Sequence, residues 1–213
     1  MGPVLQQDAQ NRLLCIEGVD EVVDGDVTVK MTLTFPGCGM GPYIAQQAEW
    51  RIAEFYRPFH DALRELLDAT RKRFGMAVLI DCHSMPSVGG PLDRDRGRER
   101  ADIVLGDRFG ASCATQLIER VHDVLAGLGY RVAHNVPYAG GFTTEHYGRP
   151  LQGVHALQIE INRSLYMDER RLRRHDGMER VARDMTDLVT ALMEWDVRDW
   201  AGPRTGQARR WPL

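Results

Sequence analysis

Two stretches of this chain carry side chains whose types and spacing suit hydrolytic chemistry. In the first, Asp81–Ser84, a histidine lies among polar neighbours directly after the apolar run Met76–Ile80. In the second, Glu160 is flanked by isoleucines and is followed by Arg163. Neutral imidazole is a common zinc ligand, a carboxylate near a metal-bound water can act as general base, and the arginine fork holds carboxylates. His83, Glu160 and Arg163 would therefore suit hydrolysis of an amide in an acidic substrate.

Each of these residues also has a structural interpretation. Asp81 and Ser84 can cap the next turn, and His83 can be an ordinary loop histidine. The grouping at the predicted end of a buried strand favours a site, because ligands of α/β proteins bind outside the carboxyl ends of strands. Glu160, near the end of another predicted strand, also favours a site, since burying a carboxylate is unfavourable unless it has a partner or a function.

The elements that must position these residues follow from hydrophobic periodicity. Alternating or continuous apolar runs predict strands at 27–35, 76–80, 102–106, 130–135 and 154–161. Apolar residues at three- and four-residue spacing predict helices at 44–74, 114–128 and about 178–195. Pro58 should break or bend the first of these helices. The alternation predicts a single-domain α/β fold with a central, mixed, largely parallel sheet flanked by helices.

Two loops lie next to the predicted strand ends. The glycine- and arginine-rich segment after Ser87 is expected to be exposed and able to move over the strand end. Its four alternating arginines, from Arg94 to Arg100, are interpreted as a solvated stretch, with attraction of an anionic substrate as the alternative. Val136–Pro150 combines glycines, aromatics, a histidine and an arginine after a strand, which is typical of a binding loop.

Composition excludes several classes of protein. A net charge of -3 gives no reason to expect nucleic acid as a partner. The four cysteines show no CxxC spacing and there is no secretory signal, which favours reduced thiols and a cytoplasmic location. No apolar run reaches the ~18 residues that a membrane span needs. We expect a poorly defined segment at 1–38, a domain at 39–197 and a loose tail at 198–213; the oligomeric state stays open.

Four motifs in order resemble those of the N-formylglutamate amidohydrolases, also called N-formylglutamate deformylases. They are DCHSMPS (81–87), ADIVLGDRFGASC (101–113), NVPYAGGFTTEHYGRP (135–150) and HALQIEINRSLYMDE (155–169). The resemblance runs from about Gly39 to the end of the last predicted helix. It implies a zinc-carboxypeptidase-like α/β fold and a zinc cofactor. It also implies hydrolysis of N-formyl-L-glutamate to formate and L-glutamate, a small-molecule reaction of histidine degradation.

The resemblance also implies roles for single residues. His83 matches the histidine of the DCHS motif, a metal ligand, and Glu160 matches the acid of the QxE motif, the general base. Arg163, in the NR pair, corresponds to a contact with a substrate carboxylate. The remaining matches fall in the family's binding loop, with roles that the sequence does not separate: Asn135, Tyr138, Gly140, Gly141 and His146.

One part of the family pattern is absent. Family members begin with a strand leading to a proline–histidine–small–glycine motif, which should supply further metal ligands, but the first histidine here is His60. The resemblance therefore implies an incomplete zinc site, with Asp81 and His83 on one strand face as a weak two-ligand alternative. His60, His134 and His146 are the other candidates. The chain is expected to be a truncated product, one with a misplaced start, a non-catalytic member that binds an acidic ligand, or a zinc hydrolase of another N-acyl amino acid.

Overall fold

The structure is a computed structural model that describes residues 4–7, 13–23, 26–32 and 41–196. The chain forms two compact units, Met1–Leu66 and Leu67–Leu213, which are described separately below. The predicted tail at 198–213 lies outside the described residues, and the predicted domain limits stay a prediction. None of the helices in the described ranges is long and apolar enough to cross a membrane.

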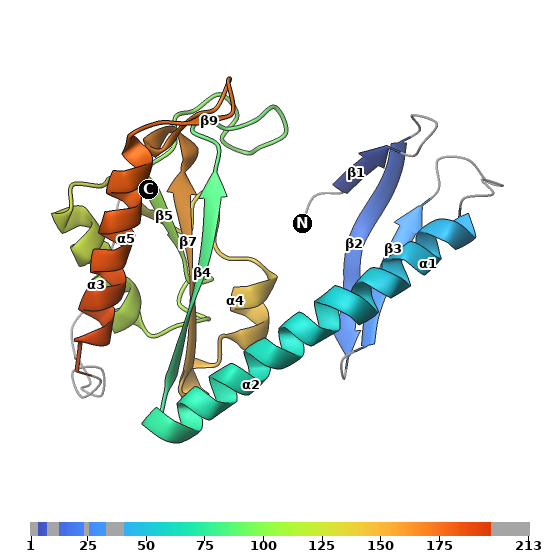
Figure 1. Ribbon diagram of the computed structural model, residues 1–213, viewed down its shortest axis with the longest axis horizontal. Helices are drawn as coiled ribbons and strands as arrows, with labels where there is room; N and C mark the ends of the chain where they lie inside the picture. The colour runs from blue at the N-terminus through green and yellow to red at the C-terminus, as the bar shows by residue number, and fades with distance from the viewer. Residues whose placement is uncertain (1–3, 8–12, 24–25, 33–40, 197–213) are drawn as a thin grey trace. The chain divides into compact units, whose positions relative to one another are not determined.

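The first unit contains a three-stranded antiparallel sheet in the order β1-β2-β3 (Figure 1). Its strands are β1 (Val4–Gln7), β2 (Leu13–Val23) and β3 (Asp26–Thr32). The predicted strand at 27–35 overlaps β3, and its last three residues lie outside the described ranges. The register of β2 against β3 shifts twice, between Ile16 and Gly18 and between Val19 and Glu21.

A long helix follows, and its hydrogen-bond pattern changes where the sequence predicts a disturbance. It consists of α1 (Gly41–Arg51), a π-helical turn (Ile52–Tyr56) and α2 (Arg57–Phe74). The Arg57 N–H donates to the Ile52 carbonyl, five residues back, directly before Pro58. Because proline has no N–H to continue the α-helical ladder, the change of register at this point agrees with the prediction.

The second unit is built on a four-stranded sheet in the order β4-β7-β5-β6. Its strands are β4 (Ala77–Met85), β5 (Ile103–Gly106), β6 (Val132–His134) and β7 (Val154–Asn162). The β4–β7 and β5–β6 pairings are parallel, and the β5–β7 pairing is antiparallel. The predicted α/β class with a mixed, largely parallel sheet is therefore confirmed.

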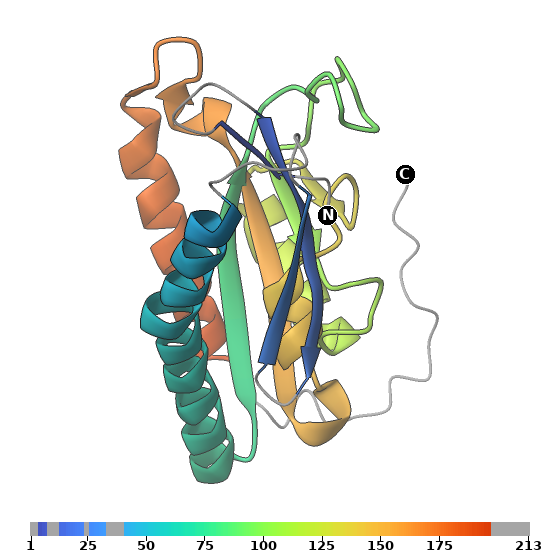
Figure 2. The ribbon, with the colours of Figure 1, turned by 90° about the vertical axis from the view of Figure 1, so that its right-hand side faces the viewer.

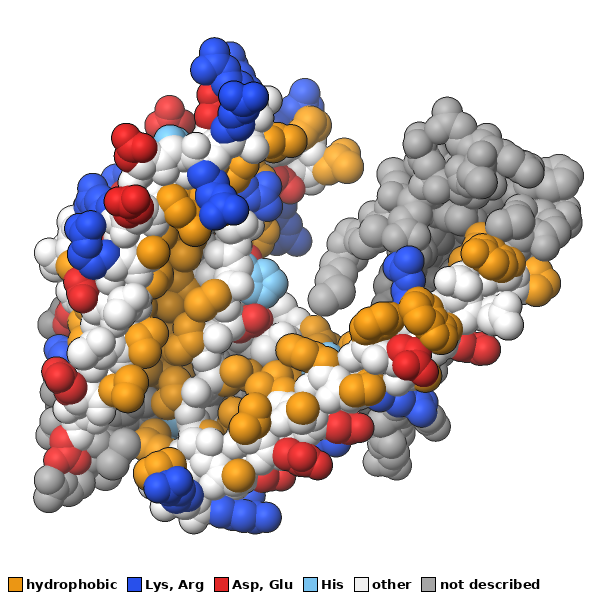
Figure 3. Space-filling view, viewed as in Figure 1, with side chains coloured by type: hydrophobic (Ala, Val, Ile, Leu, Met, Phe, Trp, Pro, Cys, Tyr) orange, Lys and Arg blue, Asp and Glu red, His pale blue; other side chains and the backbone are white. Residues whose placement is uncertain are grey.

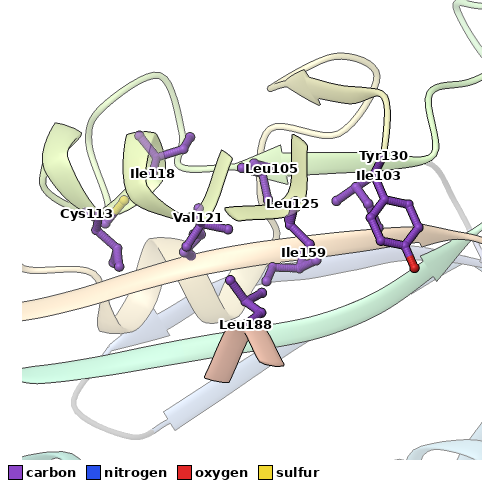
Figure 4. Packing of buried hydrophobic residues seen from close by; sticks show 11 residues of the cluster. Ile103, Leu105, Cys113, Ile118, Val121, Leu125, Tyr130, Ile159 and Leu188 are labelled. Atoms are coloured by element: carbon purple, nitrogen blue, oxygen red, sulfur yellow. The ribbon is translucent and has the colours of Figure 1, made fainter. Parts of the chain in front are cut away.

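Helices lie on both faces of this sheet (Figures 1 and 2). On one face, α3 (Thr115–Gly127) and α5 (Gly177–Met193) enclose the hydrophobic core, and Figure 4 shows Leu188 of α5 next to Ile159 of β7, with Val121 of α3 in the same cluster. The short helix α4 (Phe142–Tyr147) lies on the other face. The remaining small elements are the 3-10 turns Pro150–Gln152 and Arg163–Leu165 and the strand pair β8 (Met167–Asp168) and β9 (Arg173–Arg174).

Strand β4 differs from its prediction in length and in burial. The sequence predicts a strand that is buried on both faces and ends at Ile80, but β4 continues to Met85. It is also an edge strand, in which Val78 is 38% exposed and Cys82 is exposed. Figure 3 shows hydrophobic side chains along the strip between α5 and β4. Asp81 and His83 thus lie within a strand, because pairing with β7 extends β4 through its polar residues.

Candidate functional site

The pairing of β4 with β7 brings the two predicted groups of residues together. In the parallel register Asp81 lies opposite Gln158, and His83 lies opposite Glu160. Ile159, between Gln158 and Glu160, belongs to the core, and alternate residues of a strand share a face. These four side chains therefore lie on the opposite face, where Gln158 contacts Gly141 at the start of α4. His83 Nδ1 and Glu160 Oε1 are 4.0 Å apart. The two strand ends that the sequence singled out, at His83 and at Glu160, therefore lie next to each other.

The His83 imidazole lies between two carboxylates. Its Nε2 is 3.2 Å from Asp81 Oδ1, and its Nδ1 faces Glu160. The histidine side chain is 49% exposed and the Asp81 side chain 18%, so the imidazole can be reached from solvent. The imidazole thus contacts Asp81 through Nε2 and turns Nδ1 towards Glu160, and in its neutral form one of these nitrogens donates and the other accepts.

Glu160 is buried and held in one orientation by its neighbours. It is 6% exposed, and the Gln158 side-chain amide donates to its Oε1 at 2.6 Å. The Gln158 carbonyl oxygen in turn accepts from the Gly141 N–H at 2.7 Å. Burial raises the pKa of Glu160, although His83, Gln158 and Arg163 act in the opposite direction. A raised pKa brings a carboxylate closer to the range in which a general base works.

Gln158 is a site residue that the sequence analysis did not identify, although it belongs to the QxE motif. The two-residue spacing to Glu160 is the signal that could have identified it, because positions two apart on a strand share one face. Its contact with Gly141 ties β7 to the loop after β6. The loop that was predicted to bind the substrate is thereby linked to the predicted base.

Arg163 lies directly after β7, in the turn Arg163–Leu165. Its Nε donates to the Ser84 hydroxyl at 3.2 Å and one terminal nitrogen donates to the Ser84 carbonyl at 3.2 Å. The guanidinium is therefore fixed at the end of β4, near the Glu160 charge on which it acts. Its other terminal nitrogen has no hydrogen-bond partner among the described side chains and main chain, so a ligand carboxylate could bind there.

Two glycines, Gly106 and Gly140, let the predicted binding loop lie close to the sheet. A Cβ on Gly106 would lie 2.7 Å from the Ala139 carbonyl carbon, so the loop lies directly against β5. Gly140 has a φ of +120°, and a Cβ there would collide with the Thr144 hydroxyl. Side chains at these positions would displace the loop, which explains why glycine occupies them. Gly141 contributes its N–H to the contact with Gln158.

Asn135 shapes the same loop through its side chain. Its backbone is in the left-handed region, with φ +59°. Its side-chain oxygen accepts from the Asp107 and Phe109 N–H groups, and its amide donates to the Asp107 carboxylate at 2.8 Å. The segment Arg108–Gly110 also has positive φ throughout. The described contacts of Asn135 thus support a strained turn that lies next to the loop.

The aromatic and histidine candidates have different surroundings. Tyr138 accepts a hydrogen bond from buried Arg100, so the arginine run predicted to be solvated contributes a buried residue to the site region. His146 lies in α4, a helix inside the segment predicted to be a loop, where its ring stacks on Phe142 at 4.9 Å. His134 contacts His122 at 2.9 Å. Burial, and the nearby His122, lower the pKa of His134 to about 4.

The side chains of the described residues do not fit a complete catalytic zinc site. No group of three His, Cys, Asp or Glu residues in the described ranges is arranged to hold a metal ion. His134 pairs directly opposite Leu105, a core residue, which places it on the face away from Glu160. His60, in α2, packs against Tyr56 of the π-helical turn and against Phe59. A three-ligand zinc site would need donors beyond His83 and its neighbouring carboxylates.

The fold and this site define an α/β protein with a buried carboxylate, an imidazole and an arginine at one end of a mixed sheet. The sequence pattern of the family described as N-formylglutamate amidohydrolase matches residues 20–167. The chain is 36% identical over 147 residues to the N-formylglutamate deformylase of Pseudomonas putida and 35% identical over 160 residues to that of Pseudomonas aeruginosa. The chain belongs to the N-formylglutamate amidohydrolase family.

The similarity covers different shares of the proteins compared. The two aligned regions are 68% and 74% of this chain, but only 54% and 59% of the Pseudomonas proteins. The crystal structure of N-formylglutamate amidohydrolase from Ralstonia eutropha JMP134 is similar with a TM-score of 0.64 and 37% identity. That match covers 72% of this chain and 55% of the other. The chain therefore spans just over half the length of the relatives it matches.

Proposed function

We propose that the chain acts on N-formyl-L-glutamate, hydrolysing its formamide bond to formate and L-glutamate. The observation that carries the proposal is the convergence of His83 and Glu160 at 4.0 Å, with Arg163 fixed nearby. Two relatives that are more than a third identical are named N-formylglutamate deformylase, which supports the same substrate.

The chain's own residues have distinct roles in this proposal. Glu160, with its raised pKa, takes a proton from the water that attacks the formyl carbon and later returns it to the leaving amine nitrogen. His83 lies 3.2 Å from Asp81 and 4.0 Å from Glu160 and can pass to solvent the second proton of the attacking water, which is freed when the product ionises to formate. Arg163 binds a carboxylate of the substrate through its remaining terminal nitrogen. The loop containing Gly140 and its neighbours covers the substrate.

Several finer expectations belong to the same proposal. They are activation of the water by zinc with His83 as a ligand, a zinc-carboxypeptidase-like fold, a place in histidine degradation, a small acidic substrate and a cytoplasmic location. We assign no step to the metal, because the described residues do not form a three-donor group. Substrate contacts of Asn135, Tyr138, Gly140, Gly141 and His146 remain predictions.

A second candidate function is binding of an acidic ligand without catalysis. The absence of a three-donor group among the described residues favours it, whereas the buried carboxylate favours hydrolysis. A hydrolase of another N-acyl amino acid would use the same residues with a different acyl group or side chain.

One set of measurements tests the proposal on the purified 213-residue chain. Zinc content is measured by metal analysis, binding of N-formyl-L-glutamate by calorimetry, and formate release by an enzymatic assay with zinc added. We expect binding of N-formyl-L-glutamate, less than one zinc per chain, and slow formate release. Binding without formate release would favour the non-catalytic candidate. Neither binding nor release would refute both, and robust release with one bound zinc would show that the metal donors have been undercounted.

A further inference from the structure

The segment that links β4 to β5 is organised around one buried guanidinium. The Arg100 side chain is 1% exposed. Its Nε donates to Asp95, one terminal nitrogen donates to the Pro86 carbonyl and the Tyr138 hydroxyl, and the other donates to Asp93 and Asp95. Arginine has five N–H donors, and each has an acceptor here. Arg100 therefore holds three parts of the chain together: the backbone at Pro86, the two aspartates of the linking segment, and Tyr138 of the binding loop.

The contact with Tyr138 determines which way the phenol can donate. The Tyr138 oxygen accepts from Arg100 at 3.0 Å, and the guanidinium also lies 5.1 Å from the ring centroid. A guanidinium has no acceptor, so the phenol must donate its own hydrogen elsewhere. Among the described residues no acceptor for that hydrogen is found. Because Tyr138 is only partly buried, a ligand or water can take this position.

Tyr138 lies in the part of the loop that reaches the site face of the sheet. The next residue, Ala139, lies against Gly106, and Gly106 pairs opposite Gln158. Burial raises the pKa of Tyr138, with a smaller contribution in the same direction from Glu160, while Arg100 lowers it. The phenol is thus protonated at neutral pH and can act as a hydrogen-bond donor. It also lies near enough to Glu160 for that carboxylate to affect its pKa.

We propose that Arg100 is a positioning residue that holds the Tyr138 hydroxyl as a hydrogen-bond donor to the formyl oxygen of the substrate. The inference rests on the proposed function and extends it. When water adds to the formyl carbon, Glu160 takes the water's proton, a C–O bond forms, and the carbonyl electron pair moves onto the formyl oxygen. A donor aimed at that oxygen stabilises the negative charge. When the C–N bond then breaks, the proton passes to the amine nitrogen, which leaves as glutamate.

Arg100 contributes to this role without touching the substrate. Its donation to the phenol oxygen polarises the O–H bond and makes it a stronger donor, as expected in a chain of hydrogen bonds. Its four other hydrogen bonds prevent the guanidinium from turning towards the substrate itself. Lysine at this position would keep the charge but could not reach acceptors on four different residues in the same geometry.

The test follows Tyr138 directly, by NMR of chain labelled with ¹³C at the ζ carbon of tyrosine. The Tyr138 signal is identified by its loss in Tyr138→Phe, a variant that leaves four of the five Arg100 hydrogen bonds in place. Arg100→Lys is the test variant, and Arg96→Lys, an exposed arginine in the same segment, is the matched control. Circular dichroism confirms that each variant is folded. N-formyl-L-glutamate is then titrated into each protein.

We expect N-formyl-L-glutamate to move the Tyr138 signal in the wild-type chain and in Arg96→Lys. In Arg100→Lys the shift at saturation should be smaller, because the hydroxyl is no longer held towards the formyl oxygen. In formate release, Tyr138→Phe should lower kcat by about 100-fold with KM nearly unchanged, because the bond forms in the transition state. A Tyr138 signal that does not move at saturation would overturn the inference. An Arg100→Lys titration that coincides with that of the wild-type chain would overturn it as well.

A separate measurement distinguishes failure of this inference from failure of the proposed function. If N-formyl-L-glutamate does not bind to the wild-type chain, the proposed function fails. The positioning role is then decided by pH titration of the Tyr138 signal in the free proteins. Loss of the hydrogen bond from Arg100 should raise the pKa of Tyr138 in Arg100→Lys and leave it unchanged in Arg96→Lys. Identical titrations in all three proteins would refute the positioning role.

Discussion

Replacing Glu160 by glutamine should remove turnover and make the folded chain more stable. The carboxylate is 6% exposed, and its described partners are one amide donor and an imidazole 4.0 Å away. Glutamine has the same shape, and its carbonyl oxygen can keep accepting from Gln158. The substitution therefore removes a buried charge without creating a cavity. Loss of a general base should reduce formate release by about 100-fold or more.

The direction and the pH dependence of the stability gain follow from the raised pKa of Glu160. The folded state binds the proton more tightly than the unfolded chain, so this group favours folding most below the unfolded pKa of about 4.3. That contribution is lost as the pH rises through the folded-state pKa. Since His83, Gln158 and Arg163 offset part of the desolvation, we expect Glu160→Gln to raise the unfolding free energy by about 1 kcal/mol near pH 7.

Urea denaturation followed by circular dichroism at several pH values measures this difference, and formate release measures the loss of turnover. The gain over wild type should shrink as the pH falls towards 4, where both proteins carry a neutral group. Glu65→Gln, at an exposed position of α2, is the matched control and should change stability little at any pH. A Glu160→Gln chain that is less stable than wild type at pH 7, or a gain independent of pH, would refute the reasoning.

Three further substitutions test other parts of the structure. Tyr130→Phe removes a 2.5 Å hydrogen bond to buried Asp184 and should lower the unfolding free energy by about 2 kcal/mol, measured by urea denaturation; no loss would mean that water replaces the phenol. Gly106→Ala places a Cβ 2.7 Å from the Ala139 carbonyl carbon, which should destabilise the chain by about 2 kcal/mol and weaken binding of N-formyl-L-glutamate in calorimetry; a neutral effect would disprove the close approach. Arg163→Lys should raise KM for N-formyl-L-glutamate about tenfold; a smaller effect on N-formyl-L-glutamine would assign the contact to the side-chain carboxylate and an equal effect to the α-carboxylate, whereas no effect on either substrate would argue against the carboxylate contact.

Much of the second unit could be predicted from local sequence patterns. The predicted helices at 114–128 and about 178–195 correspond to α3 and α5 within a few residues, because their apolar stripes have helical spacing. The predicted strand at 154–161 corresponds to β7, since its residues alternate between the core and the site face. The short helix α4 was missed because six residues inside a glycine- and proline-rich segment give no periodic signal.

The burial of Arg100 shows why part of the site could not be predicted. Four arginines alternate in its segment, and three of them are exposed, as the interpretation of a solvated stretch expects. Arg100 differs because Asp93 and Asp95 fold back onto it and Tyr138 approaches from a loop 38 residues later. Which of the four arginines is buried depends on which acceptors the fold brings close to each guanidinium. No property of the arginine itself distinguishes it.

The sequence by itself determined the residue types of the site, the family, and the two-residue spacings that put Asp81 with His83 and Gln158 with Glu160. These follow from local geometry, because strand periodicity is set by the backbone. Only the tertiary structure decided that His83 lies opposite Glu160, that β4 is an edge strand, and that Arg100 is buried. These outcomes depend on strand register and on side-chain packing between segments far apart in the chain, which local preferences do not specify.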